Sequence, residues 1–569
     1  MRFILSTSRH ECPTGLRSTA GVSGQYRGGR GRMNKAIQGL EMSIQRAICV
    51  APIFGLISLA CAAQTTIDPH TMPKTGQVDP RFVSYNIEAV EITGGRFWKP
   101  YSADVEASLT AAPQAKHDQN QPVGMDPKLF QYRKPIDLGN PRLLKLASAL
   151  APAYIRVSGT WRNSTYFQDN DDPAMPAAPK GFNGVLTRTQ WKGVVDFSHA
   201  TGAEIVTSVA TSAGTRDTNG FWTPGQAKAL FDFTKSLGGR IAATEFMNEP
   251  TYAEIGGAPR GYDSAAFAKD AKLFKRFLRS ESPDTIFLGP GGVGEGPPMI
   301  EGMPPQKIIS TEGIMKDTGP IFDIFSYHFY GTVSRRCTAA LGPNAGMSAE
   351  KALSSAWLDK NKAVEEFYAK IRDAYLPGKA MWLTETGEAG CGGDRWAAEF
   401  IDSFRYLDQL GSLAQKGVQI VMQNTLASSD YGLLDEETLD PRPNYWSTLL
   451  WKQTMGMRVL DPGVAPTSTL RIYAHCMKDN NGGVSVLALN LDRAREQILH
   501  IPISGERYSM TAPDLLSKTV SLNGVELKAS ADGSLPKLYG QSIKAGNISL
   551  APLTITFIVL PAATNGSCK

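Results

Sequence analysis

The chain has 569 residues, of which 42% are hydrophobic and 20% charged, a composition typical of a globular protein with more than one domain. Its formal charge of +5 is uneven, because residues 1–46 hold eight Lys or Arg against two Glu, a net of +6, and residues 47–63 hold no charge. The rest of the chain therefore carries a formal charge of −1, which gives no electrostatic reason to expect a nucleic acid as partner.

The first 63 residues have the pattern of a targeting segment. Arg46 precedes an apolar run at 48–60, which ends in a small-x-small cleavage pattern at 60–62. At about 13 residues the run is shorter than the roughly 20 that span a bilayer, and no later run is both apolar and long enough. Met33 or Met42 would be a better start for such a signal than the first residue. We therefore expect an exported protein, periplasmic or secreted, without an integral membrane segment after signal removal; the alternative is a buried helix at 48–60.

From residue 80 onward, short β-rich apolar runs alternate with amphipathic helical patterns. The candidate strands lie at 82–90, 153–157, 204–209, 241–246, 285–288, 321–327, 380–384 and 417–422. Helical patterns lie at 142–150, 190–201, 224–237, 264–279, 349–374 and 395–415. Eight strands, each followed by a helix or a long loop, predict an α/β fold in the form of a (β/α)8 TIM barrel over 80–455.

After about residue 456 the pattern changes to short strands divided by Gly, Asn, Asp and Pro, with no long helix between them. These runs lie at 469–474, 484–491, 497–501, 520–522 and 555–560. They predict a C-terminal antiparallel β-sandwich of 456–569, to which we also assign 64–79.

Two glutamates stand at matching places in the predicted barrel. Glu249 follows the fourth strand in an Asn-Glu-Pro sequence, and Glu385 ends the seventh. The carboxyl ends of barrel strands meet at one mouth, where two carboxylates can flank a sugar as acid and nucleophile. Asn-Glu-Pro alone is more often a helix N-cap with Pro in the first turn, but the pairing with a second Glu at the right strand favours catalysis.

The sequence Ser-Tyr-His-Phe-Tyr-Gly at 326–331 closes the sixth strand between these two glutamates. A Tyr hydroxyl such as that of Tyr330 can hold a nucleophilic carboxylate ionised, and His328 could orient the same group. The alternative is an aromatic cluster that serves packing. No His pair has metal-ligand spacing, and no nucleotide-binding motif stands in strand–helix context, so we expect no metal and no cofactor.

Together these motifs resemble the heparanase-like β-glucuronidases, glycoside hydrolase family 79, retaining enzymes with catalytic Glu on barrel strands four and seven. The similarity covers nearly all of 80–569, through motifs at 153–160, 248–250, 382–386, 421–423, 430–436, 443–446, 470–476 and 515–524. The resemblance implies that Glu249 is the acid/base, that Glu385 is the nucleophile, and that Asn248 belongs to the substrate site.

The resemblance also implies a substrate with glucuronic acid, either a glycan or a glucuronide. Family members hold the sugar carboxylate with a glycine-rich loop past the nucleophile and a Tyr after strand eight; here Gly392, Gly393 and Tyr431 take those places. Glycines let backbone N–H groups approach an anion, although such a loop is often only a turn. The alternatives are a retaining hydrolase for a neutral sugar, of arabinofuranosidase or xylosidase type, and a non-catalytic carbohydrate-binding protein.

The chain departs from the family pattern at four positions: Gly390 and Cys391 lack an expected Tyr, Glu88 replaces an Asp, and Trp161 replaces a Lys. These departures leave the hydrolase chemistry intact but affect the substrate subsites.

Four cysteines lie beyond the targeting segment, which in an exported chain suggests up to two disulfides. Cys337 follows strand six and Cys391 follows strand seven, so we expect these two to pair. Cys476 and Cys568 both belong to the sandwich, and the resemblance implies that they pair as well.

Overall fold

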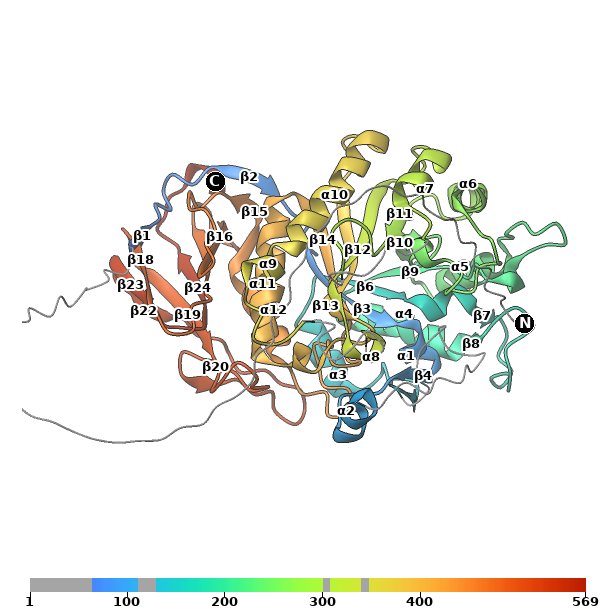
Figure 1. Cartoon of the computed structure of the whole chain (residues 1–569), viewed down its shortest axis with the longest axis horizontal. Coiled ribbons are helices and arrows are strands. Elements are labelled where there is room, and N and C mark those ends of the chain that lie inside the picture. Colours follow the sequence, from blue (N-terminus) through green and yellow to red (C-terminus); the bar gives the residue numbers. More distant parts are fainter. Residues whose placement is uncertain (1–63, 111–128, 300–307, 339–346) are drawn as a thin grey trace, which may run out of the picture. The chain divides into compact units, whose positions relative to one another are not determined.

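The computed structural model describes residues 64–110, 129–299, 308–338 and 347–569 (Figure 1). The expected targeting segment at 1–63, including Met33 and Met42, lies outside the described residues. Among the helices of the described residues, none is both long and apolar enough to cross a membrane.

Parallel strands close into a barrel, and each overlaps one of the eight strands predicted from sequence. They are β3 (Val83–Glu88), β6 (Tyr154–Ser158), β9 (Glu204–Ser208), β10 (Ile241–Glu245), β11 (Ile286–Gly292), β12 (Ile324–Val333), β13 (Met381–Gly390) and β14 (Val418–Gln423). The last strand, β14, pairs with the first, β3, which closes the circle. The predicted TIM barrel is confirmed.

The larger helices of the barrel follow its strands (Figure 1). They are α3 (Pro141–Ser148), α4 (Arg188–Thr201), α5 (Gly225–Ser236), α6 (Ser264–Glu281), α7 (Thr311–Thr318), α10 (Lys360–Tyr375), α11 (Phe400–Gln415) and α12 (Pro443–Thr454). Local sequence sets their ends: α4 begins in a capping box of Thr187 and Gln190 and ends at Gly202 in the left-handed conformation. Helix α12 begins with Pro443 in its first turn.

The predicted single helix at 349–374 is wrong at its start. Residues 349–354 form turns and bends, and the Ser354 hydroxyl accepts from Trp357 N and caps a short helix, α9 (Ser355–Leu358). Asp359 then begins α10.

Short elements complete the connections between barrel strands. They are α1 (Ala89–Thr93), β4 (Gly95–Trp98), α2 (Ala103–Thr110), β5 (Phe130–Arg133), β7 (Thr165–Gln168), β8 (Gly184–Thr187) and α8 (Arg335–Thr338), with 3₁₀ turns at Thr160–Ser164, Ala213–Thr215, Pro250–Tyr252 and Arg395–Ala398. A further 3₁₀ turn, Gly566–Cys568, follows the last strand of the C-terminal sheets.

The barrel interior has two layers, which follow from the period of two along each strand. Near the amino-terminal ends of the strands the buried inward side chains are apolar: Tyr154, Val206, Ala243, Leu288, Trp382, Ile420 and Met422. The rings of Tyr154 and Trp382 pack with centroids 5.0 Å apart. Further along the same strands the interior becomes polar and charged, and that layer holds the candidate site.

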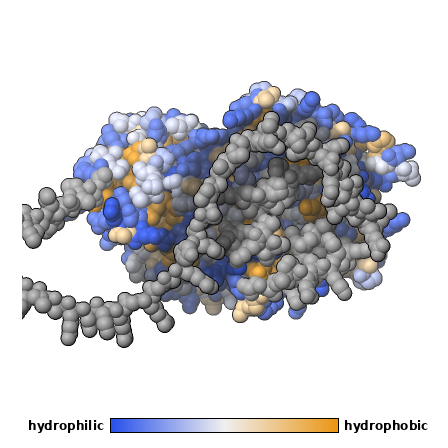
Figure 2. All heavy atoms as spheres, viewed as in Figure 1, coloured by the Kyte–Doolittle hydropathy of each residue, from blue (hydrophilic) through white to orange (hydrophobic). Residues whose placement is uncertain are grey.

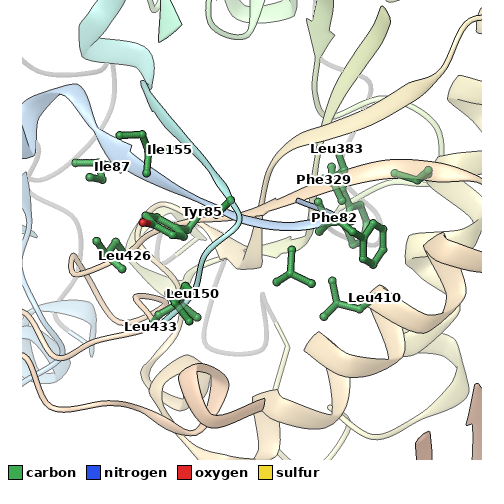
Figure 3. Close-up of a cluster of buried hydrophobic side chains, with 14 of the residues drawn as sticks. Phe82, Tyr85, Ile87, Leu150, Ile155, Phe329, Leu383, Leu410, Leu426 and Leu433 are labelled. Atoms are coloured by element: carbon green, nitrogen blue, oxygen red, sulfur yellow. The ribbon is translucent and has the colours of Figure 1, made fainter. Parts of the chain in front are cut away.

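A second apolar core lies outside the strands, between the barrel and its helices. Figure 3 shows part of it, with side chains from barrel strands, from the segments just before β3, after α3 and after β14, and from α11: Phe82, Tyr85, Ile87, Leu150, Ile155, Phe329, Leu383, Leu410, Leu426 and Leu433. Hydrophilic residues dominate the visible surface of the described chain (Figure 2), as expected for helices that bury one face only.

The C-terminal segment forms two sheets. The larger contains β2 (Lys74–Gln77), β15 (Met455–Leu460), β16 (Leu470–Met477), β17 (Val484–Asn490), β24 (Thr554–Leu560), β19 (Gly505–Thr511), β20 (Ser521–Leu522), β21 (Val525–Glu526) and β22 (Gln541–Ile543), all in antiparallel pairs. The smaller contains β1 (Gln64–Thr66), β18 (Gln497–Ile501) and β23 (Gly546–Leu550). Strands β1 and β2 bring 64–77 into these sheets, and β1 differs from the prediction because it pairs in parallel with β18.

The larger sheet packs against α11 of the barrel. A Cβ on Gly411 would lie 2.2 Å from the ring of Tyr473, so only glycine lets the sheet approach this closely. The Tyr473 hydroxyl donates to Asp408 at 2.5 Å, and Arg471 pairs with Asp359 at 2.9 Å.

Candidate active site

A buried arginine organises the polar layer of the barrel. Arg156 on β6 donates from Nε and Nη2 to one oxygen of Glu245, at 3.0 and 2.8 Å, and from Nη1 to Glu385 Oε2 at 2.8 Å. Glu245 on β10 also accepts from Ser326 and Thr384. Because both carboxylates and the guanidinium are almost fully buried, each charge is tolerated only through its partner.

An irregularity on β13 aims Glu385 into the barrel. Opposite β12 the register changes between the pairs Tyr327–Leu383 and His328–Glu385, so two steps on β13 match one on its partner. Thr384 and Glu385, although consecutive, therefore both face the interior: Thr384 reaches Glu245, and Glu385 reaches Arg156 and Tyr330.

Glu249 leaves β10 through a strained turn. Its φ of 48° and ψ of 61° lie in the left-handed region, which is unusual for a side chain larger than hydrogen. The turn is held by Asn163, whose side chain accepts from Asn248 N and donates to Asn248 O, both at 2.9 Å. The Asn248 side chain in turn accepts from Arg156 at 2.7 Å. The Glu249 side chain stays 20% exposed, against 7% for Glu385.

His328 on β12 lies between the two candidate carboxylates. Its Nδ1 is 3.1 Å from Glu249 Oε1 and 3.8 Å from Glu385 Oε2, and its Nε2 is 3.3 Å from Arg156 Nη2. Burial opposes a charged imidazole, but Glu385 and the other carboxylates outweigh it and raise the pKa of His328 to about 9. With this raised pKa the imidazole carries a proton on Nδ1, which is directed at Glu249 Oε1.

The surroundings move the two candidate carboxyl groups in opposite directions. Burial is the main reason that the pKa of Glu249 is raised, with Glu385 repulsion adding to it. Burial would also raise the pKa of Glu385, but His328, Arg156 and the Tyr330 hydroxyl bond outweigh it, and the pKa is lowered. One group is thus favoured as an acid and the other as an anion, the division that acid and nucleophile roles require.

A group of hydroxyl and amide side chains surrounds Glu385. The Tyr330 hydroxyl donates to Glu385 Oε1 at 2.7 Å, and Asn424 Nδ2, just past β14, lies 3.0 Å from that hydroxyl and 3.1 Å from the hydroxyl of Tyr431. Asn424 also donates to Glu88 at 3.1 Å. Burial and then Glu385 raise the pKa of Glu88 well above its usual value, which favours the protonated form of this carboxyl group.

The glycine-rich loop follows β13 directly. Cys391, Gly392 and Gly393 all have positive φ, and Gly393 packs on Tyr431, where a Cβ would lie 3.1 Å from the Tyr431 backbone. Gly393 N–H donates to Ala389 O at 3.1 Å, so this expected donor is already bonded. No group of the described residues accepts a hydrogen bond from Gly392 N–H, which makes it a candidate donor for a ligand.

The structure brings the predicted site residues together, except that the N–H of Gly393 is already bonded to Ala389 O and is not free to bind a ligand. Glu249, Glu385, Asn248, His328 and Tyr330 are linked directly or through Arg156, and Tyr431 joins them through Asn424. The two expected cysteine pairs, Cys337–Cys391 and Cys476–Cys568, are both bonded, with Cα atoms 6.4 and 5.3 Å apart. Trp161, one of the departures from the family pattern, packs edge-on against Phe97 with centroids 5.2 Å apart.

Sequence reasoning did not assign roles to Arg156, Glu245, Asn163 and Asn424. For Arg156 and Glu245 a signal was present, because each is a charged residue in an otherwise apolar barrel strand. Such a charge is tolerated inside a barrel only with a partner of opposite sign.

Ligand atoms of Glu249, His328 and Glu385 lie within 4.8 Å of one another, close enough to consider a metal ion. However, Arg156 already contacts Glu385 and lies beside His328, so its positive charge stands where a cation would need to be. These side chains suit a reaction in which the two carboxyl groups act directly as acid and nucleophile. That the site holds no resident metal remains a prediction.

Comparison with known proteins finds relatives among glycoside hydrolases. A family model described as glycosyl hydrolase family 79, N-terminal domain, matches residues 105–411. Heparanase of Mus musculus is 27% identical over 512 residues, covering 78% of this chain and 89% of that protein. Baicalin-β-D-glucuronidase of Scutellaria baicalensis is 26% identical over 478 residues, covering 75% of this chain and 84% of that protein.

Solved structures show the same fold. A 4-O-α-L-rhamnosyl-β-D-glucuronidase from Fusarium oxysporum 12S matches with a TM-score of 0.60 and 12% sequence identity, covering 87% of this chain and all of that one. The family model spans more than half of the sequence, and the chain therefore belongs to glycosyl hydrolase family 79.

Proposed function

We propose that this glycoside hydrolase cleaves β-glucuronosyl linkages with retention of configuration, with Glu249 as general acid/base and Glu385 as nucleophile. The observation that carries the proposal is the distance between the two groups: a carboxylate oxygen of Glu249 lies within 4.8 Å of one of Glu385. Retaining enzymes place their carboxyl groups about 5–5.5 Å apart, whereas inverting enzymes need about 6.5–9.5 Å to admit a water molecule.

In the first step, the Glu385 carboxylate attacks the anomeric carbon while Glu249 gives its proton to the departing glycosidic oxygen. Arg156 and the Tyr330 hydroxyl each bind one oxygen of Glu385 and hold it ionised and correctly turned. In the second step, Glu249, now a carboxylate, takes a proton from water as the water attacks the glycosyl–Glu385 ester. His328 Nδ1–H stabilises Glu249 most when Glu249 is ionised, which aids the second step.

The preference for a glucuronide rests on neutral donors near the nucleophile. Gly392 N–H and the Tyr431 hydroxyl lie on two segments that pack together, and both can donate to a sugar carboxylate. Arg156 is not available for this purpose, because its bonds are taken by Glu245, Asn248 and Glu385. A buried carboxylate is stable only with such hydrogen bonds, so donors at this position favour an acidic sugar.

The natural substrate is then a glucuronic-acid-containing glycan or a smaller glucuronide.

We also propose that the protein is exported. The two disulfides support this, because such bonds persist mainly outside the reducing cytosol.

The test compares kcat/KM for an aryl β-glucuronide and the matched aryl β-glucoside, and follows the configuration of the first product by NMR. We expect the β-hemiacetal to form first and the glucuronide to be preferred by at least about 100-fold, since unpaired donors discriminate strongly. Tyr431→Phe should lower glucuronide turnover more than glucoside turnover. An inverted first product would overturn the retaining mechanism, and an equal or faster glucoside would replace the glucuronide by a neutral sugar.

A further inference from the structure

The glycine-rich loop is fastened to a neighbouring helix beyond the barrel. Strands β12 and β13 continue past the barrel in register, with Val333 opposite Gly390, and this places α8 beside the loop. Ser334 N donates to Gly390 O at 3.0 Å, and the Cys337–Cys391 disulfide joins the helix to the loop covalently. The loop is thus tied at its first two residues.

Arg336, between these two anchors, is a buried arginine outside the catalytic layer. Its guanidinium donates to Gly393 O at 2.6 Å, Cys391 O at 3.4 Å and Lys99 O at 2.8 Å, and its Cζ lies 3.9 Å from the centroid of the Tyr101 ring. Its side chain is fully inaccessible to solvent. The mechanism above gives this charge no role.

The contact of Arg336 with Cys391 O determines where the adjacent N–H points. In a trans peptide the C=O and N–H directions are opposite, and Cys391 O shares its peptide unit with Gly392 N–H. When the carbonyl is directed at Arg336, Gly392 N–H is directed away from it. The next two peptide units are also fixed, since Gly392 O accepts from Asp430 N at 3.1 Å and Asp394 N donates to Glu388 at 2.7 Å.

Arg336 also connects the loop to the segment that carries Tyr431. Its Nη2 is ion-paired with Asp430, the residue before Tyr431, and Asp430 N holds Gly392 O. The two donors proposed to bind the sugar carboxylate, Gly392 N–H and the Tyr431 hydroxyl, are therefore attached to one rigid group.

We propose that Arg336 and the Cys337–Cys391 disulfide are positioning elements that set the selectivity for the substrate carboxylate, by fixing Gly392 N–H relative to Tyr431. This inference rests on the proposed glucuronidase function. Donors that are held in place before binding do not need to be reorganised, and small displacements of such groups weaken binding strongly. The elements touch neither Glu249 nor Glu385, so they act on recognition of the acid group and not on bond cleavage.

The test measures kcat/KM for an aryl β-glucuronide and the matched β-glucoside in the wild type, Arg336→Lys, Arg336→Gln and the double variant Cys337→Ser/Cys391→Ser. We expect kcat/KM for the glucuronide to fall by about 10- to 100-fold, mainly because KM rises. The value should be highest in the wild type, lower in Arg336→Lys and lowest in Arg336→Gln. Glucoside kcat/KM should change by less than about twofold. The cysteine variant keeps Arg336 paired with Asp430, so it remains informative if the arginine variants fold poorly.

The second disulfide supplies the matched control. Cys476→Ser/Cys568→Ser removes the bond in the sandwich, and it should lower the melting temperature while the glucuronide-to-glucoside ratio stays at the wild-type value. If the Arg336 and Cys337/Cys391 variants lose kcat/KM equally on both substrates, or keep the wild-type glucuronide-to-glucoside ratio, the positioning role is overturned. The proposed glucuronidase function would still stand. A wild-type ratio near one would instead overturn the glucuronide assignment, and the inference with it.

Discussion

The two layers of the barrel interior are built from the same strands but have different roles, one in stability and the other in the proposed reaction. On β6, Tyr154 packs on Trp382 in the lower layer, and two residues later Arg156 binds both Glu245 and Glu385. The lower layer is apolar and well packed; the upper one is charged, hydrogen-bonded and includes a residue with left-handed backbone, Glu249. A shift of about 7 Å along a strand thus separates side chains that stabilise the fold from side chains that carry out the reaction.

The largest effect should come from removing a carboxyl group of the upper layer. Glu385→Gln should lower kcat by about 10⁴-fold or more, and Glu249→Gln by about 10²- to 10⁴-fold, because an amide can neither attack nor exchange a proton. The fold should be preserved, since each amide is nearly isosteric with the acid and Arg156 keeps its ion pair with Glu245. Glu254→Gln, an exposed position near Glu249, is the control and should retain full activity.

Azide distinguishes the two roles. In Glu385→Ala it can replace the nucleophile directly and give a glycosyl azide of inverted configuration. In Glu249→Ala it should act on the glycosyl–enzyme ester and give a product of retained configuration. The opposite assignment of products would exchange the roles of the two residues.

A smaller effect is expected from the group that orients the nucleophile. Tyr330→Phe removes a hydrogen bond to an ionised carboxylate, worth about 1.5–3 kcal/mol, and should lower kcat/KM by about 10- to 150-fold. Tyr327→Phe is the matched control on the same strand, because Tyr327 packs on Tyr368 outside the barrel, with centroids 5.0 Å apart. If both variants lose activity equally, the hydroxyl of Tyr330 has no special role.

The pH dependence follows from the opposed pKa shifts. Glu385 must be ionised, so kcat/KM should fall as pH decreases through its lowered pKa, and Glu249 must be protonated, so kcat/KM should fall as pH increases through its raised pKa. Each limb should approach a tenfold change per pH unit. In Glu249→Gln, an aryl substrate with a strongly acidic phenol needs no acid catalyst, and its profile should lose the basic limb. Retention of that limb would assign it to another group.

Much of this arrangement could be predicted from the sequence, because apolar runs mark barrel strands and two glutamates lie on or just after the correct ones. Helix α12 was missed because it is buried around most of its surface, so its sequence has no polar stripe. Helix α7 has only eight residues and contains Gly313, which weakens the helical pattern. Distances across the barrel are not encoded locally, which is why the Arg156–Glu245–Glu385 network and the contacts of Asn424 required the structure.

The smallest effect on activity is expected from a change in the lower layer. Leu288→Ala on β11 removes a fully buried side chain and leaves a cavity, which should decrease the free energy of unfolding by about 2–5 kcal/mol. The melting temperature should fall by several degrees, whereas kcat/KM measured well below it should remain within about threefold of the wild type. Leu516→Ala, at a position that is 45% exposed in the sandwich, should change neither quantity. A large activity loss in Leu288→Ala without loss of stability would mean that the two layers are mechanically coupled, and that packing near the amino-terminal ends of the strands sets the distance between Glu249 and Glu385.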